Sequence, residues 1–110
     1  MNMIHPATVE AFHQAIADYP AVLVDFYKDN CPGCKMLEAS LGKLSGAEFD
    51  DLPLVKAKLE VLGEDFFKGV GLRQTPTLLA YRNAAEVARL PGFQTPKTLE
   101  DWVRKNMLAG

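Results

Sequence analysis

The sequence is poor in cysteine, in basic runs and in long apolar segments, and each shortage excludes a class of protein. Its 110 residues include two cysteines, too few for the several disulfides that stabilise small secreted domains. No apolar segment is long enough for a membrane span or a signal peptide, so we expect a cytoplasmic protein without a membrane partner. The net charge is −2 and no basic run carries aromatic residues, which argues against a nucleic-acid partner.

The remaining composition is that of a globular domain. Hydrophobic residues make up 48% of the chain and charged residues 24%, close to the averages of folded soluble proteins. A chain of this length favours a single domain, here residues 1–110, with one hydrophobic core. The small size and the lack of an exposed apolar helix in the pattern predict a monomer.

Apolar periodicity predicts helices that alternate with short strands, and hence a mixed α/β domain. Apolar residues recur every three or four positions in the predicted helices, whereas the predicted strands are short apolar runs. In chain order, we expect a helix capped by Thr8, a strand from Ala21 to Tyr27, a helix from Pro32, a strand from Leu54 to Leu59, a short helix from Glu64 to Lys68, a hairpin of Thr77 to Tyr81 with Glu86 to Leu90, and a last helix capped by Thr95.

Both cysteines lie in the segment 31–34, which has the sequence Cys-Pro-Gly-Cys at the predicted start of a helix. Two thiols at this spacing can form a disulfide with little movement of the backbone. Free N–H groups and the helix dipole stabilise a thiolate at the N-cap, so Cys31 is the expected nucleophile and Cys34 the resolving thiol. A zinc site is disfavoured because it needs four ligands and His5 and His13 lie far upstream. An inert buried pair would not require this spacing.

Four landmarks follow one another along the chain: Val24-Asp25-Phe26, the cysteine motif, Thr75-Pro76-Thr77 and Gly92. Their order and spacing resemble those of the thioredoxin family, over roughly Thr8 to Met107. The resemblance implies an α/β thioredoxin fold, in which a central mixed β-sheet is flanked by helices on both faces. It also implies a protein-disulfide reductase that acts on disulfide-containing proteins and receives electrons from a flavoprotein thioredoxin reductase. No cofactor is implied beyond the redox-active Cys31–Cys34 disulfide.

Asp25 interrupts the apolar run from Ala21 to Tyr27, and its neighbours favour a buried carboxylate over one at a wet edge. Burial without partners would raise the pKa of such a carboxylate. The resemblance implies that Asp25 lies beneath the disulfide and assists proton transfer to and from Cys34. It also matches Lys58 to a family lysine that approaches this aspartate. The alternative for Lys58 is a strand lysine that points to solvent beside Lys56.

The resemblance assigns substrate contacts to residues in three segments. Thr75 and Pro76 match the family's cis-proline site, where the backbone before the proline pairs with an extended substrate, although an ordinary proline at a strand start has the same sequence. Gly92 either leaves room for a partner chain or is a turn glycine. Pro32 and Gly33, between the cysteines, complete the expected substrate-binding set.

The cysteine motif departs from the family pattern. Most thioredoxins have Trp-Cys-Gly-Pro-Cys, whereas this chain has Asn30 before the first cysteine and a reversed Pro-Gly dipeptide. Residues between the cysteines change the relative stability of thiolate and disulfide, which leaves the reduction potential open. Pro32 and Thr75 also keep open an oxidant or isomerase with the same fold. A non-catalytic binding or scaffold module is the third alternative.

Overall fold

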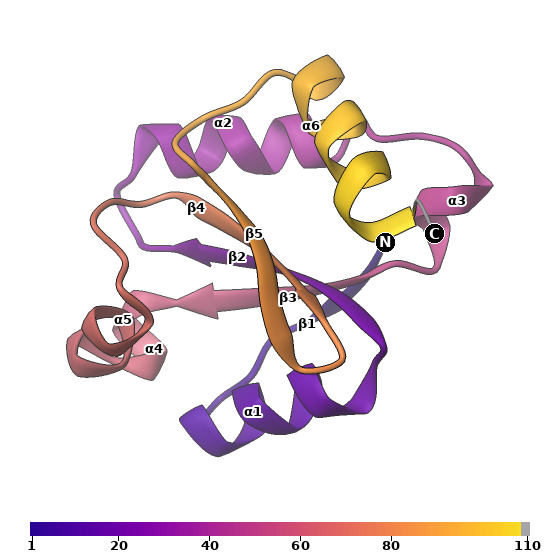
Figure 1. The fold of residues 1–110 in the computed structure, drawn as a ribbon. Helices are drawn as coiled ribbons and strands as arrows, with labels where there is room; N and C mark the ends of the chain where they lie inside the picture. Colours follow the sequence, from indigo (N-terminus) through magenta and orange to yellow (C-terminus); the bar gives the residue numbers. More distant parts are fainter. Residues whose placement is uncertain (109–110) are drawn as a thin grey trace.

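A five-stranded sheet forms the centre of the computed structural model, which describes residues 1–108 (Figure 1). The strands are β1 (Asn2–Ile4), β2 (Ala21–Tyr27), β3 (Pro53–Lys58), β4 (Thr77–Arg82) and β5 (Ala85–Pro91). Their order across the sheet is β1-β3-β2-β4-β5. Strands β1, β3 and β2 run parallel to one another. Strand β4 is antiparallel to β2, and β5 is antiparallel to β4, so the sheet is mixed.

Helices cover both faces of the sheet (Figure 1). One face carries α1 (Val9–Asp18), α4 (Leu59–Leu62) and α5 (Glu64–Val70), and the other carries α2 (Pro32–Leu41), α3 (Ala47–Asp50) and α6 (Pro96–Val103), which continues into the helical turn η1 (Arg104–Leu108). Each helical layer buries its own hydrophobic cluster against the sheet. The expected mixed sheet between two helical layers is confirmed.

Strand β2 lies in the middle of the sheet and is buried on both faces. Val24 and Phe26 belong to the cluster under α1, and Leu23 belongs to the cluster under α2. Asp25 shares the face of Leu23, because side chains alternate along a strand, and it is fully buried. The interpretation of this segment as a central strand is confirmed.

Local sequence signals set the helix starts and the hairpin. Thr8 and Thr95 cap α1 and α6, and each side-chain oxygen accepts a hydrogen bond from the backbone N–H three residues later. Asn83 and Ala84 turn the chain between β4 and β5 with φ values of 52° and 66°. Positive φ at both central residues matches the twist of the paired strands.

Three short elements were not predicted from the sequence. The strand β1 contains 3 residues and the helices α3 and α4 contain 4 each, too few to display a helical or strand period. Leu44 continues the apolar spacing of α2 but lies beyond the end of that helix at Leu41.

None of the helices within residues 1–108 is long and apolar enough to cross a membrane.

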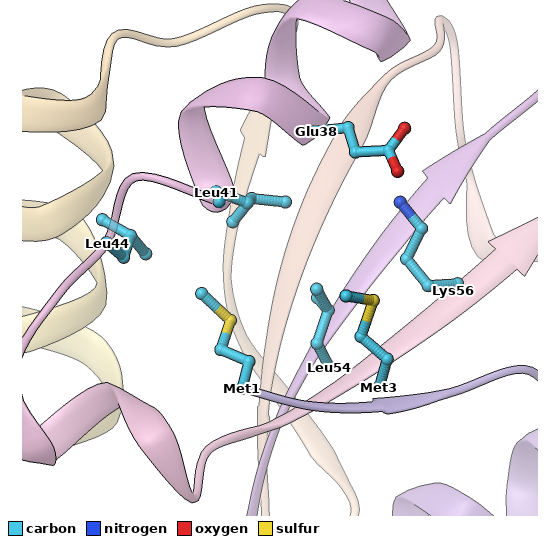
Figure 2. A pocket seen from close by; sticks show the side chains of 8 residues that line it. Met1, Met3, Glu38, Leu41, Leu44, Leu54 and Lys56 are labelled. Atoms are coloured by element: carbon cyan, nitrogen blue, oxygen red, sulfur yellow. The ribbon is translucent and has the colours of Figure 1, made fainter.

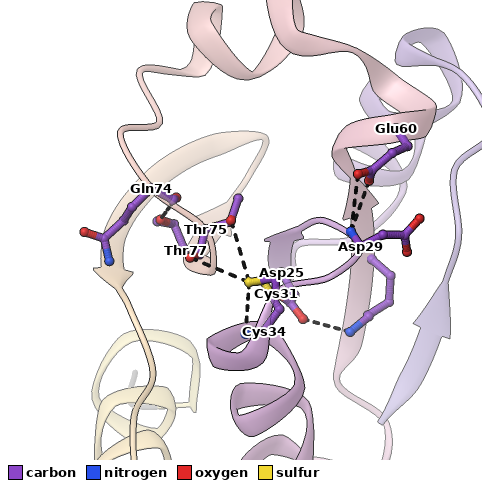
Figure 3. Close-up of a disulfide and its surroundings, with 9 residues drawn as sticks. Asp25, Asp29, Cys31, Cys34, Glu60, Gln74, Thr75 and Thr77 are labelled. Carbon is purple, nitrogen blue, oxygen red and sulfur yellow. Dashed lines mark hydrogen bonds and ion pairs between the residues drawn. A yellow bond between two sulfur atoms is a disulfide. The ribbon is translucent and has the colours of Figure 1, made fainter.

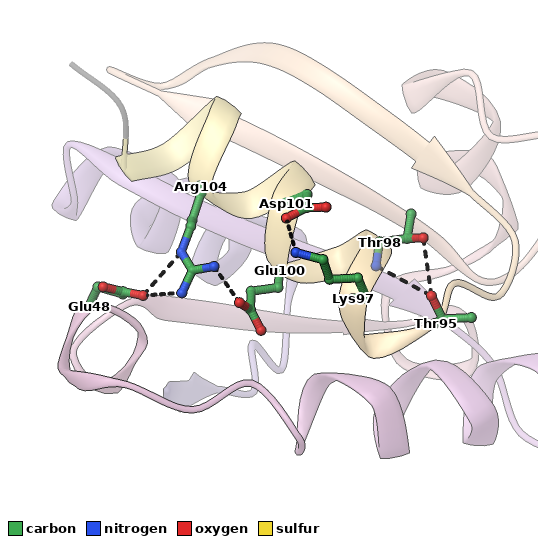
Figure 4. A network of polar contacts seen from close by, with 7 residues as sticks. All are labelled: Glu48, Thr95, Lys97, Thr98, Glu100, Asp101 and Arg104. Carbon is green, nitrogen blue, oxygen red and sulfur yellow. Dashed lines mark hydrogen bonds and ion pairs between the residues drawn. The ribbon is translucent and has the colours of Figure 1, made fainter.

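An ion-pair network attaches the C-terminal helix to α3 (Figure 4). Arg104, which follows α6, lies 2.5 Å from a carboxylate oxygen of Glu48 and also pairs with Glu100 one turn earlier. Its guanidinium stacks over the ring of Phe49 at 5.2 Å from the centroid. These contacts hold the C-terminal helix on the same face of the sheet as α2.

Candidate active site

The C-terminal end of β2 leads into the cysteine segment at the start of α2. Cys31 is the N-cap residue of α2, with Pro32 at the first helical position. The Sγ atom of Cys31 accepts a hydrogen bond from the backbone N–H of Cys34 at 3.2 Å, and the two cysteines form a disulfide with Cα atoms 5.2 Å apart. Both are buried, with 7% and 5% of their surface exposed. The expected N-cap placement, which favours a thiolate at Cys31, is confirmed.

The loop before β4 approaches the disulfide from the side opposite α2 (Figure 3). The Thr75–Pro76 peptide bond is cis, as expected. The carbonyl oxygen and the hydroxyl oxygen of Thr75 each lie 3.8 Å from Cys31 Sγ, close enough to interact weakly with a reduced thiol. A Cβ atom added to Gly33 would lie 3.3 Å from the ring of Pro76, so the small residue allows the loop to pack closely.

Gly92, the residue after β5, supports the same loop. Its backbone N–H donates a hydrogen bond of 2.8 Å to the carbonyl oxygen of Pro76, and its φ is 81°, which favours glycine. The next residue, Phe93, keeps 40% of its surface exposed, and Met36 on α2 keeps 50%. Phe93 and Met36 were not singled out from the sequence, because only the fold shows that they remain exposed beside the cysteine and cis-proline segments.

Asp25 forms a buried ion pair with a lysine from the neighbouring strand. Its Oδ2 atom accepts a hydrogen bond from Lys56 Nζ at 2.8 Å, whereas Oδ1 has no hydrogen-bond partner within residues 1–108. Burial raises the pKa of Asp25 above its usual value, the Lys56 ammonium lowers it in part, and the charge of Glu38 raises it further. The Lys56 ammonium also lies 4.5 Å from the centre of the Tyr27 ring.

The expected approach of Lys58 to Asp25 is wrong. Strand pairing aligns Asp25 with Lys56 and places Lys58 beside Tyr27, at the end of β3. Lys58 instead forms an ion pair with Asp29 at 3.0 Å. Both lysines point to the same face of the sheet, so the alternation of side chains could not distinguish them. The distinction depends on the register between β2 and β3.

The loop before Cys31 is held by contacts that the sequence did not suggest (Figure 3). The backbone N–H of Asp29 donates to both carboxylate oxygens of Glu60 at 3.3 Å, while the Asp29 side chain pairs with Lys58. Asn30 follows with a φ of 54°, in the left-handed region that asparagine tolerates better than most residues. This backbone conformation gives a physical reason for asparagine at the position where most thioredoxins have tryptophan.

A sequence profile of thioredoxin matches residues 3–105. The chain belongs to the thioredoxin family. It is 27% identical over 107 residues to thioredoxin from Rickettsia typhi, and the aligned region covers 96% of this chain and 100% of that protein. Thioredoxin-1 from Saccharomyces cerevisiae is 34% identical over 85 residues, or 77% of this chain and 81% of the yeast protein. A solved structure of a mutant thioredoxin from Halobacterium salinarum matches with a TM-score of 0.81 and 25% identity, over 96% of this chain and 91% of that chain.

Family membership and the cysteine pair together make this thioredoxin-family protein a thiol-disulfide oxidoreductase. Thioredoxins use a redox-active disulfide and need no bound cofactor. Within residues 1–108, no group of three or more histidine, cysteine or acidic side chains is arranged to hold a metal ion.

The left-handed conformation of Asn30 predicts a specific order of stability among variants. We expect Asn30→Ala to lower the free energy of unfolding by about 1 kcal/mol, because an L side chain other than asparagine is strained at positive φ. Asn30→Gly is the matched control and should change it less, because glycine adopts this conformation without a Cβ penalty. Urea denaturation of the oxidised proteins measures both differences. An alanine variant as stable as the wild type would contradict this explanation.

The raised pKa of Asp25 predicts how stability depends on pH. A carboxyl group with a raised pKa in the folded state binds its proton more tightly there than in the unfolded state. This tighter binding contributes its full stabilisation below pH 3.8, and the contribution is lost as pH rises through the folded pKa. Asp25→Asn removes this titration. We therefore expect the variant to gain stability relative to the wild type as pH rises from 3.8 through the folded pKa of Asp25.

Denaturation at several pH values tests this dependence on Asp25. The loss of the bond to Lys56 also changes the stability of the variant, so the slope of the stability difference with pH, and not its size at one pH, is the quantity to compare. A flat difference across this range would mean that Asp25 does not titrate with a raised pKa.

Proposed function

We propose that this protein reduces disulfide bonds in other proteins through the Cys31–Cys34 dithiol. The observation that carries the proposal is the N-cap position of Cys31, next to the cis-proline loop and one helical turn before Cys34. The helix start stabilises a thiolate at Cys31, and the loop offers an adjacent backbone to a substrate. The family relationship supports the same chemistry.

The proposed reaction has two exchange steps. The Cys31 thiolate attacks one sulfur of the substrate disulfide; the S–S bond breaks, and the other substrate sulfur leaves as a thiolate and takes up a proton. The Cys34 thiol then transfers its proton to Asp25 and attacks Cys31 Sγ. The mixed disulfide breaks, the second substrate sulfur leaves as a thiolate and takes up a proton from water, and the Cys31–Cys34 disulfide forms. Two electrons pass from the protein to the substrate.

The substrate would bind where the two active-site segments meet. We assign the contacts to Thr75 and Pro76 on the loop, Pro32 and Gly33 between the cysteines, and Gly92 beside the loop. The Thr75 backbone can pair with an extended segment of the substrate, as in strand addition. The exposed side chains of Met36 and Phe93 add apolar surface at this site.

Repeated turnover requires a donor that returns two electrons to the disulfide. We assign this role to a flavoprotein thioredoxin reductase, because members of the thioredoxin family receive electrons in this way. The dithiol persists only in a reducing compartment, so the proposal places the protein in the cytoplasm. We further propose that the protein acts as a monomer on its substrate proteins.

Serine variants test the assignment of attacking and resolving thiols. We expect Cys31→Ser to reduce insulin no faster than dithiothreitol alone, because the attacking sulfur is absent. Cys34→Ser should accumulate a mixed disulfide at Cys31, because the resolving thiol is absent. Mass spectrometry under non-reducing conditions detects the adduct. Turnover by Cys31→Ser, or failure of Cys34→Ser to trap insulin, would contradict the assigned roles.

The reduction potential of the Cys31–Cys34 pair distinguishes the reductase from an oxidant or isomerase. We expect a value near or below about −250 mV, as a disulfide reductase requires against the glutathione pool. Thiol trapping across graded redox buffers, followed by mass measurement, gives this value. A potential near or above about −180 mV would indicate an oxidant or isomerase. Failure to form a reversible disulfide would favour a scaffold.

A further inference from the structure

Glu38 lies one helical turn after Cys34 on α2 and lines two separate cavities. The first, of about 140 Å³, lies against the disulfide and is also lined by Tyr27 and both cysteines. The second, of about 130 Å³, is lined by Lys56 and by apolar side chains that include Met1 and Met3. Glu38 is the residue that the two cavities share. It therefore stands between the disulfide and the buried lysine.

Two carboxylates, those of Asp25 and Glu38, face the Lys56 ammonium. Figure 2 shows that the carboxylate of Glu38, on α2, points toward Lys56 Nζ, on β3. On its other side, Lys56 donates its hydrogen bond to Asp25. Glu38 is exposed, whereas Asp25 and Lys56 are buried. The Lys56 ammonium is thus hydrogen-bonded to a buried carboxylate and faced by an exposed one.

Few other charges act on Asp25. Of the elements packed around Asp25, α2 contributes the charge of Glu38, β3 contributes that of Lys56, and the adjacent strand β4 places the apolar Leu78 opposite Asp25. Tyr27 faces the ammonium from β2 itself. The remaining charged side chains at the disulfide cavity are Lys28, Lys35 and Asp29, and the last of these is paired with Lys58.

We propose that Glu38 is a positioning residue for proton transfer between Cys34 and Asp25. It attracts the Lys56 ammonium and places a second negative charge near Asp25, so that Asp25 can accept the proton of Cys34 instead of remaining locked as an anion paired with Lys56. The proton moves from Cys34 Sγ to an Asp25 carboxylate oxygen in the resolving step and returns when the disulfide is reduced. This inference rests on the proposed reductase function.

The charge of Glu38 can be tested without reference to activity. In the oxidised protein, where no cysteine thiol titrates, carbon-13 NMR follows the carboxyl carbon of Asp25 as pH changes. We expect Glu38→Gln to move the titration midpoint of Asp25 to lower pH, because one nearby negative charge is removed. Glu38→Lys should move it further in the same direction.

Glu10→Gln is the matched control. It makes the same change in net charge on an exposed residue of α1, which covers the opposite face of the sheet. The midpoint of Asp25 should not move in this variant. An unchanged midpoint in Glu38→Gln, or equal shifts in both variants, would overturn the role of Glu38.

The pH profile of insulin reduction connects this electrostatic effect to catalysis. We expect the limb of the profile that reports Asp25 to move to lower pH in Glu38→Gln and to stay in place in Glu10→Gln. A shifted NMR midpoint with an unshifted profile would overturn the role of Glu38 in proton transfer. If the wild type reduces no insulin while the NMR midpoint still shifts, the proposed function fails but the effect of Glu38 on Asp25 is supported.

Discussion

Burial of strand β2 on both faces is the constraint on which the active site depends. Helices cover both sides of the sheet along β2, which ends at Tyr27. Beyond this end the chain enters α2 through Cys31. One apolar strand therefore leads the chain to Cys31 at a helix start and carries Asp25 into the interior. The same burial that stabilises the fold makes the carboxylate of Asp25 difficult to ionise. The stability of the fold and the proton transfer proposed for Asp25 thus depend on the same buried residue.

The interior charges are arranged so that none of them is fully neutralised. A buried ion pair with ideal partners would hold Asp25 as an anion, and removal of either partner would leave an uncompensated charge. In this protein Lys56 satisfies one oxygen of Asp25, its ammonium also faces the Tyr27 ring, and Glu38 approaches it from solvent. Burial and the charge of Glu38 raise the pKa of Asp25, whereas Lys56 lowers it, and opposing effects of this kind are typical of carboxyl groups that take part in proton transfer.

The segments around the disulfide are held in place by contacts from distant parts of the chain. Glu60 binds the backbone before Cys31, and Gly92 binds the carbonyl of Pro76. Arg89, on β5, donates to the carbonyl oxygens of Val70 and Gly71 at the end of α5, just before the cis-proline loop. The loops that meet at the sulfur atoms are therefore positioned by the sheet edge and by α4. None of these contacts involves Pro32 or Gly33, the dipeptide between the cysteines.

Local patterns in the sequence determined the helix caps at Thr8 and Thr95, the central strand, and the cysteine pair at a helix start, because each depends on residues close together in the chain. The resemblance to thioredoxins added the fold and the cis-proline. Tertiary structure decided which lysine meets Asp25, since Lys56 and Lys58 have the same strand parity and only the register of β3 against β2 separates them. It also decided the left-handed conformation of Asn30 and the place of Glu38 between two cavities. These features depend on contacts between segments far apart in the chain, which short-range periodicity does not encode.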